Sequence, residues 1–249
     1  RATAVRLSER FFPNTPRDEL MAALQSVAAD KRPMIALQLL LSLGELKHAT
    51  AEALMADVLS AHSSPVFRTA ALSGLMGREL EFIERMLARS DWTAAKEKQS
   101  WVLEGLATAV MNEAKPDRVA CLLGLIDREI PRHPWRVEHM LFGALDGNLG
   151  KSRWPEPIRL ASKPGLLSAV SSSSRPDRAN EAARLLRIIT WPGDTTQRAT
   201  RPVLKSLSAA QQKAFTLGES VYHATCHSCH KPDGRGQAGQ APSLADSEW

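Results

Sequence analysis

Leucine-rich apolar stretches alternate with short polar turns through the first 190 residues, and this pattern predicts one short helix after another. Several of the predicted helices begin with proline, which suits the first helical turn because a backbone N–H has no partner there. Most of the connections are only a few residues long, as between antiparallel helices. The predicted helices cover residues 2–12, 17–29, 33–43, 50–62, 65–76, 79–89, 96–113, 116–126, 134–145, 165–172 and 176–189.

Composition favours the same all-α fold class. The chain of 249 residues has 32 leucines but only 18 valines and isoleucines together, which disfavours a β-sandwich or barrel. No apolar run reaches the roughly 18 residues that a membrane helix needs, so we predict no transmembrane segment. The net charge of +5 is spread without a basic stripe, so we expect no nucleic-acid partner.

An internal repeat is visible in the first part of the chain. Leu20-Met21-Ala22 recurs as Leu54-Met55-Ala56, and Pro33 recurs as Pro65, at offsets of 34 and 32 residues. One helix pair per repeat of this length is typical of an α-solenoid. Residues 1–190 thus resemble degenerate HEAT repeats, and an irregular helical bundle is the alternative.

Single residues in this region point to structure and not to chemistry. Cys121 lies in an apolar stretch and is predicted to be a small core residue. Gly44 and Gly77 are expected just past helix ends, where a left-handed backbone favours glycine. We assign no metal-binding role to the scattered His48, His62, His133 and His139, and no catalytic residue is predicted.

The composition changes at Thr190. Residues 191–206 are polar and turn-rich and are predicted to form a linker. A helix is expected from Ser208, with Gln211 completing a capping box. Residues 207–249 form the third predicted segment.

That helix leads into Cys226-His227-Ser228-Cys229-His230, a C-x-x-C-H motif. Two thiols at this spacing can each add to one haem vinyl group, and the adjacent histidine can coordinate the iron. Half of a zinc site, a redox couple and a structural disulfide between Cys226 and Cys229 are the competing interpretations.

The flanks of the motif resemble a class I cytochrome c. Gly218 lies eight residues before Cys226, and Tyr222 lies four before it. Pro242 follows His230 by twelve residues. The resemblance implies one covalent haem c, with His230 as the proximal axial ligand of the iron. It also implies that Gly218 permits a close helix crossing, that Tyr222 packs beside that crossing, and that the Pro242 carbonyl accepts the other N–H of His230.

The sequence departs from that family on the second axial side. The family's sixth ligand is usually a methionine followed by a further helix, but no methionine follows Met140 here. His223 and His227 lie on the proximal side of the motif and are not expected to reach the opposite face. We therefore expect a truncated cytochrome c domain and a chain that is a fragment of a longer protein.

The whole arrangement resembles planctomycete-type membrane-bound dehydrogenases, also described as sorbosone- or glucose-dehydrogenase-like proteins. The resemblance implies an upstream dehydrogenase domain, a HEAT region and a cytochrome c that passes electrons to a downstream acceptor, in the periplasm or another extracytoplasmic location. The alternative is a HEAT-type protein-interaction scaffold whose C-x-x-C-H is fortuitous or binds zinc.

Overall fold

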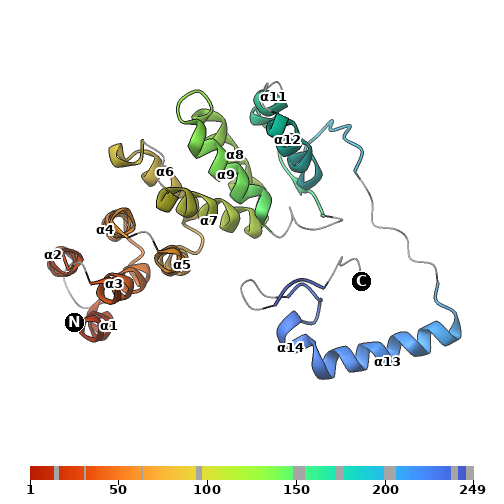
Figure 1. The fold of residues 1–249 in the computed structure, drawn as a ribbon, viewed down its shortest axis with the longest axis horizontal. Coiled ribbons are helices and arrows are strands. Elements are labelled where there is room, and N and C mark those ends of the chain that lie inside the picture. Colours follow the sequence, from red (N-terminus) through yellow and green to blue (C-terminus); the bar gives the residue numbers. More distant parts are fainter. Residues whose placement is uncertain are drawn as a thin grey trace. The chain divides into compact units, whose positions relative to one another are not determined.

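The computed structural model is mostly helical and divides into two compact units (Figure 1). The first unit spans residues 1–151 and 156–196, and the second contains residues 197–249 together with the short segment 152–155. The expectation of an all-α fold is confirmed. The structure describes residues 1–13, 17–30, 32–62, 64–93, 97–147, 155–171, 176–198, 206–236 and 241–244.

The helices of the first unit begin and end close to the predicted positions. Proline occupies the first turn of α3, α5, α8 and α9, as the sequence indicates. The elements are α1 (Ala2–Ser8), η1 (Glu9–Phe11), α2 (Arg17–Ala28), α3 (Pro33–Glu45), α4 (Ala49–Ala61), α5 (Pro65–Gly74), α6 (Glu79–Leu87), η2 (Ser90–Trp92), α7 (Glu97–Glu113), α8 (Pro116–Glu129), α9 (Pro134–Asp146), α11 (Leu166–Ser171) and α12 (Pro176–Ile188).

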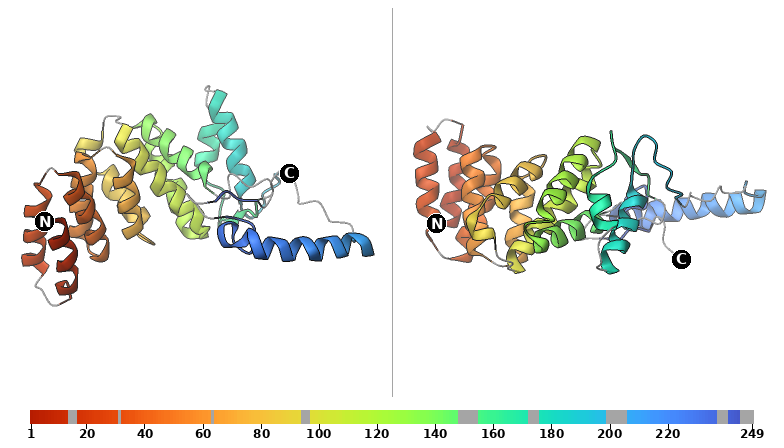
Figure 2. Two further views of the ribbon diagram at one scale, coloured as in Figure 1. Left: turned by 60° about the horizontal axis from the view of Figure 1, so that its bottom comes forward. Right: turned by 90° about the horizontal axis from the view of Figure 1, so that it is seen from above.

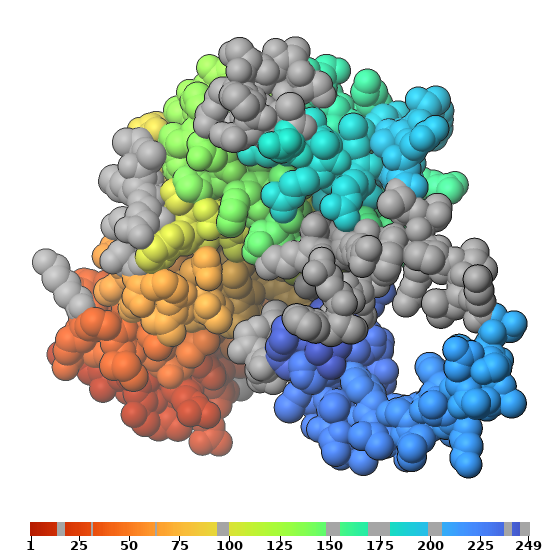
Figure 3. All heavy atoms as spheres, turned by 45° about the vertical axis from the view of Figure 1, so that its right-hand side comes forward, coloured from red at the N-terminus to blue at the C-terminus, as the bar shows by residue number. Residues whose placement is uncertain are grey.

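These helices stack in two rows. In one row α1, α3, α5, α7, α9 and α12 each pack on the next, and in the other α2, α4, α6, α8 and α11 do the same. The helices follow one another in chain order through the unit (Figures 2 and 3). The leucine-rich faces meet between the rows in one continuous apolar core, which includes the fully buried Leu39, Leu43, Leu103 and Leu106.

Glycine allows two helix pairs of the first row to touch through their backbones. A Cβ atom built on Gly44 in α3 would stand 2.6 Å from the Cα of Gly74 in α5, and one on Gly143 in α9 would stand 2.2 Å from the Glu104 carbonyl oxygen. The prediction that Gly44 follows a helix end is wrong, because the residue is buried inside α3. Gly77 does adopt the expected left-handed backbone, with φ of +78°.

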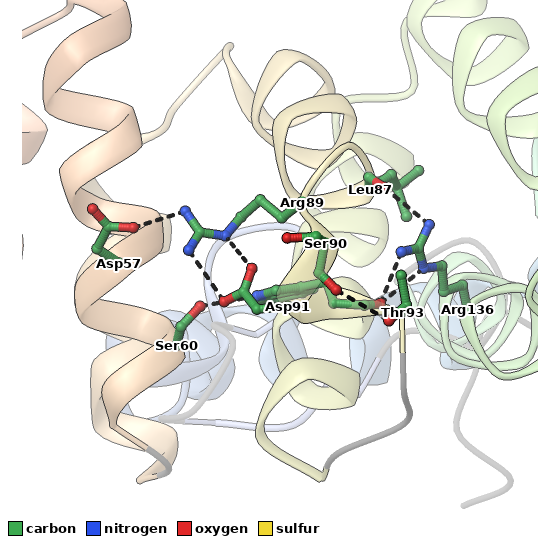
Figure 4. Close-up of polar contacts among 9 residues, drawn as sticks. Asp57, Ser60, Leu87, Arg89, Ser90, Asp91, Thr93 and Arg136 are labelled. Carbon is green, nitrogen blue, oxygen red and sulfur yellow. Dashed lines mark hydrogen bonds and ion pairs between the residues drawn. The ribbon is translucent and has the colours of Figure 1, made fainter.

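Buried polar groups tie neighbouring helices together (Figure 4). The Arg136 guanidinium in α9 is 2% exposed and donates hydrogen bonds to the carbonyl oxygens of Leu87 and Trp92. It also forms an ion pair of 2.9 Å with Glu129 in α8. All three guanidinium nitrogens of Arg136 therefore have an acceptor. A buried charge without such partners would be strongly destabilising.

Cys121 is exposed, so the prediction that it is a core residue is wrong. The face of α8 turned to the core carries Val119, Leu122, Leu123 and Ile126, and Cys121 lies on the other side of the helix. A run of apolar residues does not define an apolar helix face, because neighbours on one face are three or four positions apart.

Two short parallel strands were not predicted. Strand β1 (Ile158–Arg159) pairs with β2 (Ile189–Thr190), with Ile158 opposite Ile189. Trp191 then packs on the core. The first unit accordingly ends at Thr196 and not at Thr190, and residues 191–196 of the predicted linker belong to it. Linker residues 199–205 lie outside the described part of the chain.

No helix of the described residues is both long enough and apolar enough to cross a membrane.

Candidate functional site

The second unit is built on one long helix, α13 (Ala209–Thr225), followed by the short helix α14 (His227–His230). The predicted capping box starts α13. The Ser208 hydroxyl accepts the Gln211 backbone N–H, and the Gln211 side chain in turn accepts the Ser208 backbone N–H at 3.0 Å. The capping box fixes where α13 begins. The C-x-x-C-H motif follows at the other end of this helix.

The two thiols of the motif lie around the junction of α13 and α14. The Cys226 backbone N–H donates to the Tyr222 carbonyl at 2.8 Å and closes α13. The Cys229 backbone N–H donates back to the Cys226 carbonyl at 3.2 Å. Both cysteines are free thiols, Cys229 exposed and Cys226 half-buried, so both sulfur atoms are available for chemistry.

The His230 ring is oriented by a backbone carbonyl. Its Nδ1 lies 2.8 Å from the carbonyl oxygen of Pro242. A carbonyl oxygen only accepts hydrogen bonds, so we assign the proton to Nδ1 and leave the Nε2 lone pair free to bind a metal. This is the contact that the resemblance implies, and it is the usual way in which a metal-binding histidine is held.

Backbone hydrogen bonds link the residues that follow His230 to those around Pro242. The Gly236 N–H donates to the His230 carbonyl at 2.8 Å, and the Leu244 N–H donates to the Gly234 carbonyl at 2.7 Å. Gly236 has φ of +71°, and a Cβ there would stand 2.3 Å from the Ala241 carbonyl oxygen. Only glycine fits such an approach without moving the backbone.

Tyr222 contacts the backbone that follows the motif. Its hydroxyl donates to the carbonyl oxygen of Lys231 at 2.6 Å. Lys231 has φ of 65° and ψ of 162°, a backbone conformation that residues other than glycine rarely adopt. The resemblance pointed to the aromatic ring of Tyr222. The role of Lys231 could not be predicted from the sequence, because the carbonyl that accepts the hydrogen bond is present in every residue.

The face around Gly218 has no partner helix among the described residues. A Cβ on Gly218 would meet nothing within 4 Å, so among the described residues no helix makes the close crossing that the resemblance implies for a complete domain. No side chain of α13 is buried, and the apolar Phe215, Leu217 and Val221 are more than half exposed.

Two further histidines lie near His230, His227 within the motif and His223 in the last turn of α13. The Nδ1 of His227 lies 2.7 Å from the carbonyl oxygen of His223, and their rings stand 5.4 Å apart. His227 thus satisfies a carbonyl at the end of α13. Within the described part of the chain, no group of three or more His, Cys, Asp and Glu side chains is placed to hold a metal ion.

Comparisons with models of known protein families, with curated proteins and with solved structures found no match to this chain.

Proposed function

We propose that this chain is an electron-transfer module that carries one covalently bound c-type haem on a helical-repeat scaffold. The observation that carries the proposal is the hydrogen bond from His230 Nδ1 to the Pro242 carbonyl, within a motif whose two thiols are free. It leaves one imidazole nitrogen free in the same five-residue motif as two free thiols, and these are the groups that a c-type haem needs.

The residues present fit the group. The Cys226 and Cys229 thiols would each add their S–H across one vinyl group of the haem, forming two thioether bonds with no oxidant needed. His230 would bind the iron through Nε2, with Pro242 holding the ring through Nδ1. When bound, the haem supplies a one-electron iron couple.

The packing of the second unit supports the same proposal. Its long helix has no buried side chain, and the apolar Val221, five residues before Cys226, is 53% exposed. Helices in water are stabilised mainly by burying an apolar face. A large apolar prosthetic group attached at Cys226 and Cys229 would supply apolar surface for such packing.

The first unit would serve as the scaffold. Its two rows of stacked helices support the proposal of a HEAT-like solenoid, in which each pair buries its apolar face on the next. We further propose that electrons reach the haem from an upstream dehydrogenase domain and leave to a downstream acceptor, and that the protein works in the periplasm or another extracytoplasmic place.

Expression of the chain together with a c-type haem maturation system tests the proposal. The purified protein is assayed by pyridine haemochrome spectroscopy and for zinc content. We expect the absorption band of thioether-linked haem and a reversible one-electron redox titration. Stoichiometric zinc with no haem would instead favour a scaffold protein with a zinc-binding motif.

A further inference from the structure

The peptide after His230 is held in an unfavourable conformation. Lys231 has positive φ combined with extended ψ, which crowds its Cβ and is a region used almost only by glycine. A lysine keeps such a backbone only when neighbouring bonds hold it there. Two donors converge on the Lys231 carbonyl oxygen, namely the Tyr222 hydroxyl at 2.6 Å and the Gly234 N–H at 3.1 Å.

Tyr222 forms hydrogen bonds at both ends of the C-x-x-C-H segment. Its own carbonyl accepts the N–H of Cys226, the first residue of the motif, at 2.8 Å. Its hydroxyl reaches the carbonyl of Lys231, the first residue after the motif. Tyr222 therefore contacts both ends of the segment that bears the two thiols and His230, one end through its backbone and the other through its side-chain hydroxyl.

We propose that Tyr222 is a positioning residue whose hydroxyl holds the strained Lys231 peptide and so fixes the backbone that presents His230 to the haem iron. The haem side of this inference rests on the proposed function, whereas the hydrogen bond and its effect on the loop do not. Loss of the hydroxyl should release the segment from Lys231 to Gly236, and should loosen the orientation of the His230 ring.

The Tyr222→Phe variant of the full chain isolates the hydroxyl, because the ring remains. Amide hydrogen exchange is followed at Gly236, whose N–H donates to the His230 carbonyl. We expect exchange there to become about tenfold faster, in line with the loss of one hydrogen bond that holds the loop. In the haem-loaded chain we also expect the midpoint potential to shift, because the axial histidine is less firmly held.

The matched control is Thr216→Val. It removes another hydroxyl of α13, one that donates to the Gln212 carbonyl at 3.1 Å and does not touch the loop. Neither the exchange at Gly236 nor the potential should change. The second variant, Tyr222→Phe with Lys231→Gly, should recover slow exchange, because glycine adopts this backbone without strain.

The outcomes separate the two proposals. Faster exchange in Tyr222→Phe and recovery in the double variant support the positioning role, even if the chain takes up no haem and the proposed function fails. Unchanged exchange and potential in Tyr222→Phe overturn the role while leaving the haem proposal intact. An unprotected Gly236 amide in the unaltered chain also overturns it, since the loop would then not be held.

Discussion

Gly44 and Gly74 touch through their Cα atoms, although they lie on different helices of the first unit. A Cβ on Gly74 would stand only 2.4 Å from the Gly44 Cα, closer than non-bonded carbon atoms approach. The helices α3 and α5 can pack this closely only because both residues lack a side chain. The spacing between α3 and α5 is therefore set by these two glycines.

Gly44→Ala should destabilise the protein by about 1–3 kcal/mol, because the added methyl group forces α3 and α5 apart. Gly124→Ala is the matched control, since a Cβ at Gly124 in α8 meets nothing within 4 Å. That substitution should stabilise the protein by about 0.5–1 kcal/mol through helix propensity. Urea unfolding of the full chain, followed by circular dichroism, measures both, and a destabilising Gly124→Ala or a neutral Gly44→Ala would contradict the account.

Arg136→Ala should cost about 3–5 kcal/mol, because it leaves the buried Glu129 carboxylate without its partner. Arg89→Ala removes two ion pairs, with Asp57 and with Asp91, each at 2.8 Å, and should cost under about 1 kcal/mol because all three side chains are partly exposed. The same unfolding experiment compares the two arginines shown in Figure 4. An equal loss of unfolding free energy in the two variants would mean that burial of Arg136 does not determine how much it stabilises the protein.

Asp91 makes a small part of the stability depend on pH. Hydrogen bonds from the Arg89 side chain, with a further one from Ser60, lower the pKa of the Asp91 carboxyl below its ordinary value. A carboxyl with a lowered folded-state pKa stabilises the protein above the unfolded-state value, near 3.8, and loses that effect as the pH falls through the folded-state value.

Asp91→Asn should therefore lower the stability at pH 7 by less than about 1 kcal/mol, because both partners are partly exposed. The difference between the two proteins should shrink as the pH falls from 4 toward 2. Urea midpoints across this range measure it. A difference that stays constant down to pH 2 would show that the charge of Asp91 contributes nothing.

Ala114 adopts a left-handed backbone directly after α7, with φ of 52°. Ala114→Gly should stabilise the protein by about 0.5–1 kcal/mol, because glycine has no Cβ to clash in this conformation. Ala120→Gly, in the exposed interior of α8, should instead cost about 1 kcal/mol. Thermal unfolding of both variants tests the opposite signs, and a loss of stability in Ala114→Gly would contradict the assigned backbone.

Local signals predicted the helices of the first unit well, because proline at the first turn and short polar connections mark their ends. The pairing of Ile158 with Ile189 was not predictable in this way, since two-residue strands far apart in sequence leave no periodic pattern. The position of Gly44 within α3 was also not predictable from local signals. Glycine ends helices and also permits their close crossing, and only the position of Gly74 distinguishes the two cases.

At the candidate site, the resemblance implied the contact between His230 and Pro242, which lie twelve residues apart, and the structure contains it. It did not indicate the hydrogen bond from the Tyr222 hydroxyl to the Lys231 carbonyl. Every residue carries the same backbone carbonyl acceptor. Which carbonyl the Tyr222 hydroxyl reaches therefore depends on the course of the backbone and not on residue type.

The most direct test of the proposed function is the mass of the denatured chain after expression with a c-type haem maturation system. The account predicts that the denatured chain is heavier by the mass of one haem. Cys121→Ala should retain this haem, whereas Cys226→Ala and Cys229→Ala should retain it in a smaller fraction of chains or not at all. A chain that gains no haem mass, or one that loses it equally in the Cys121→Ala variant, would contradict the account.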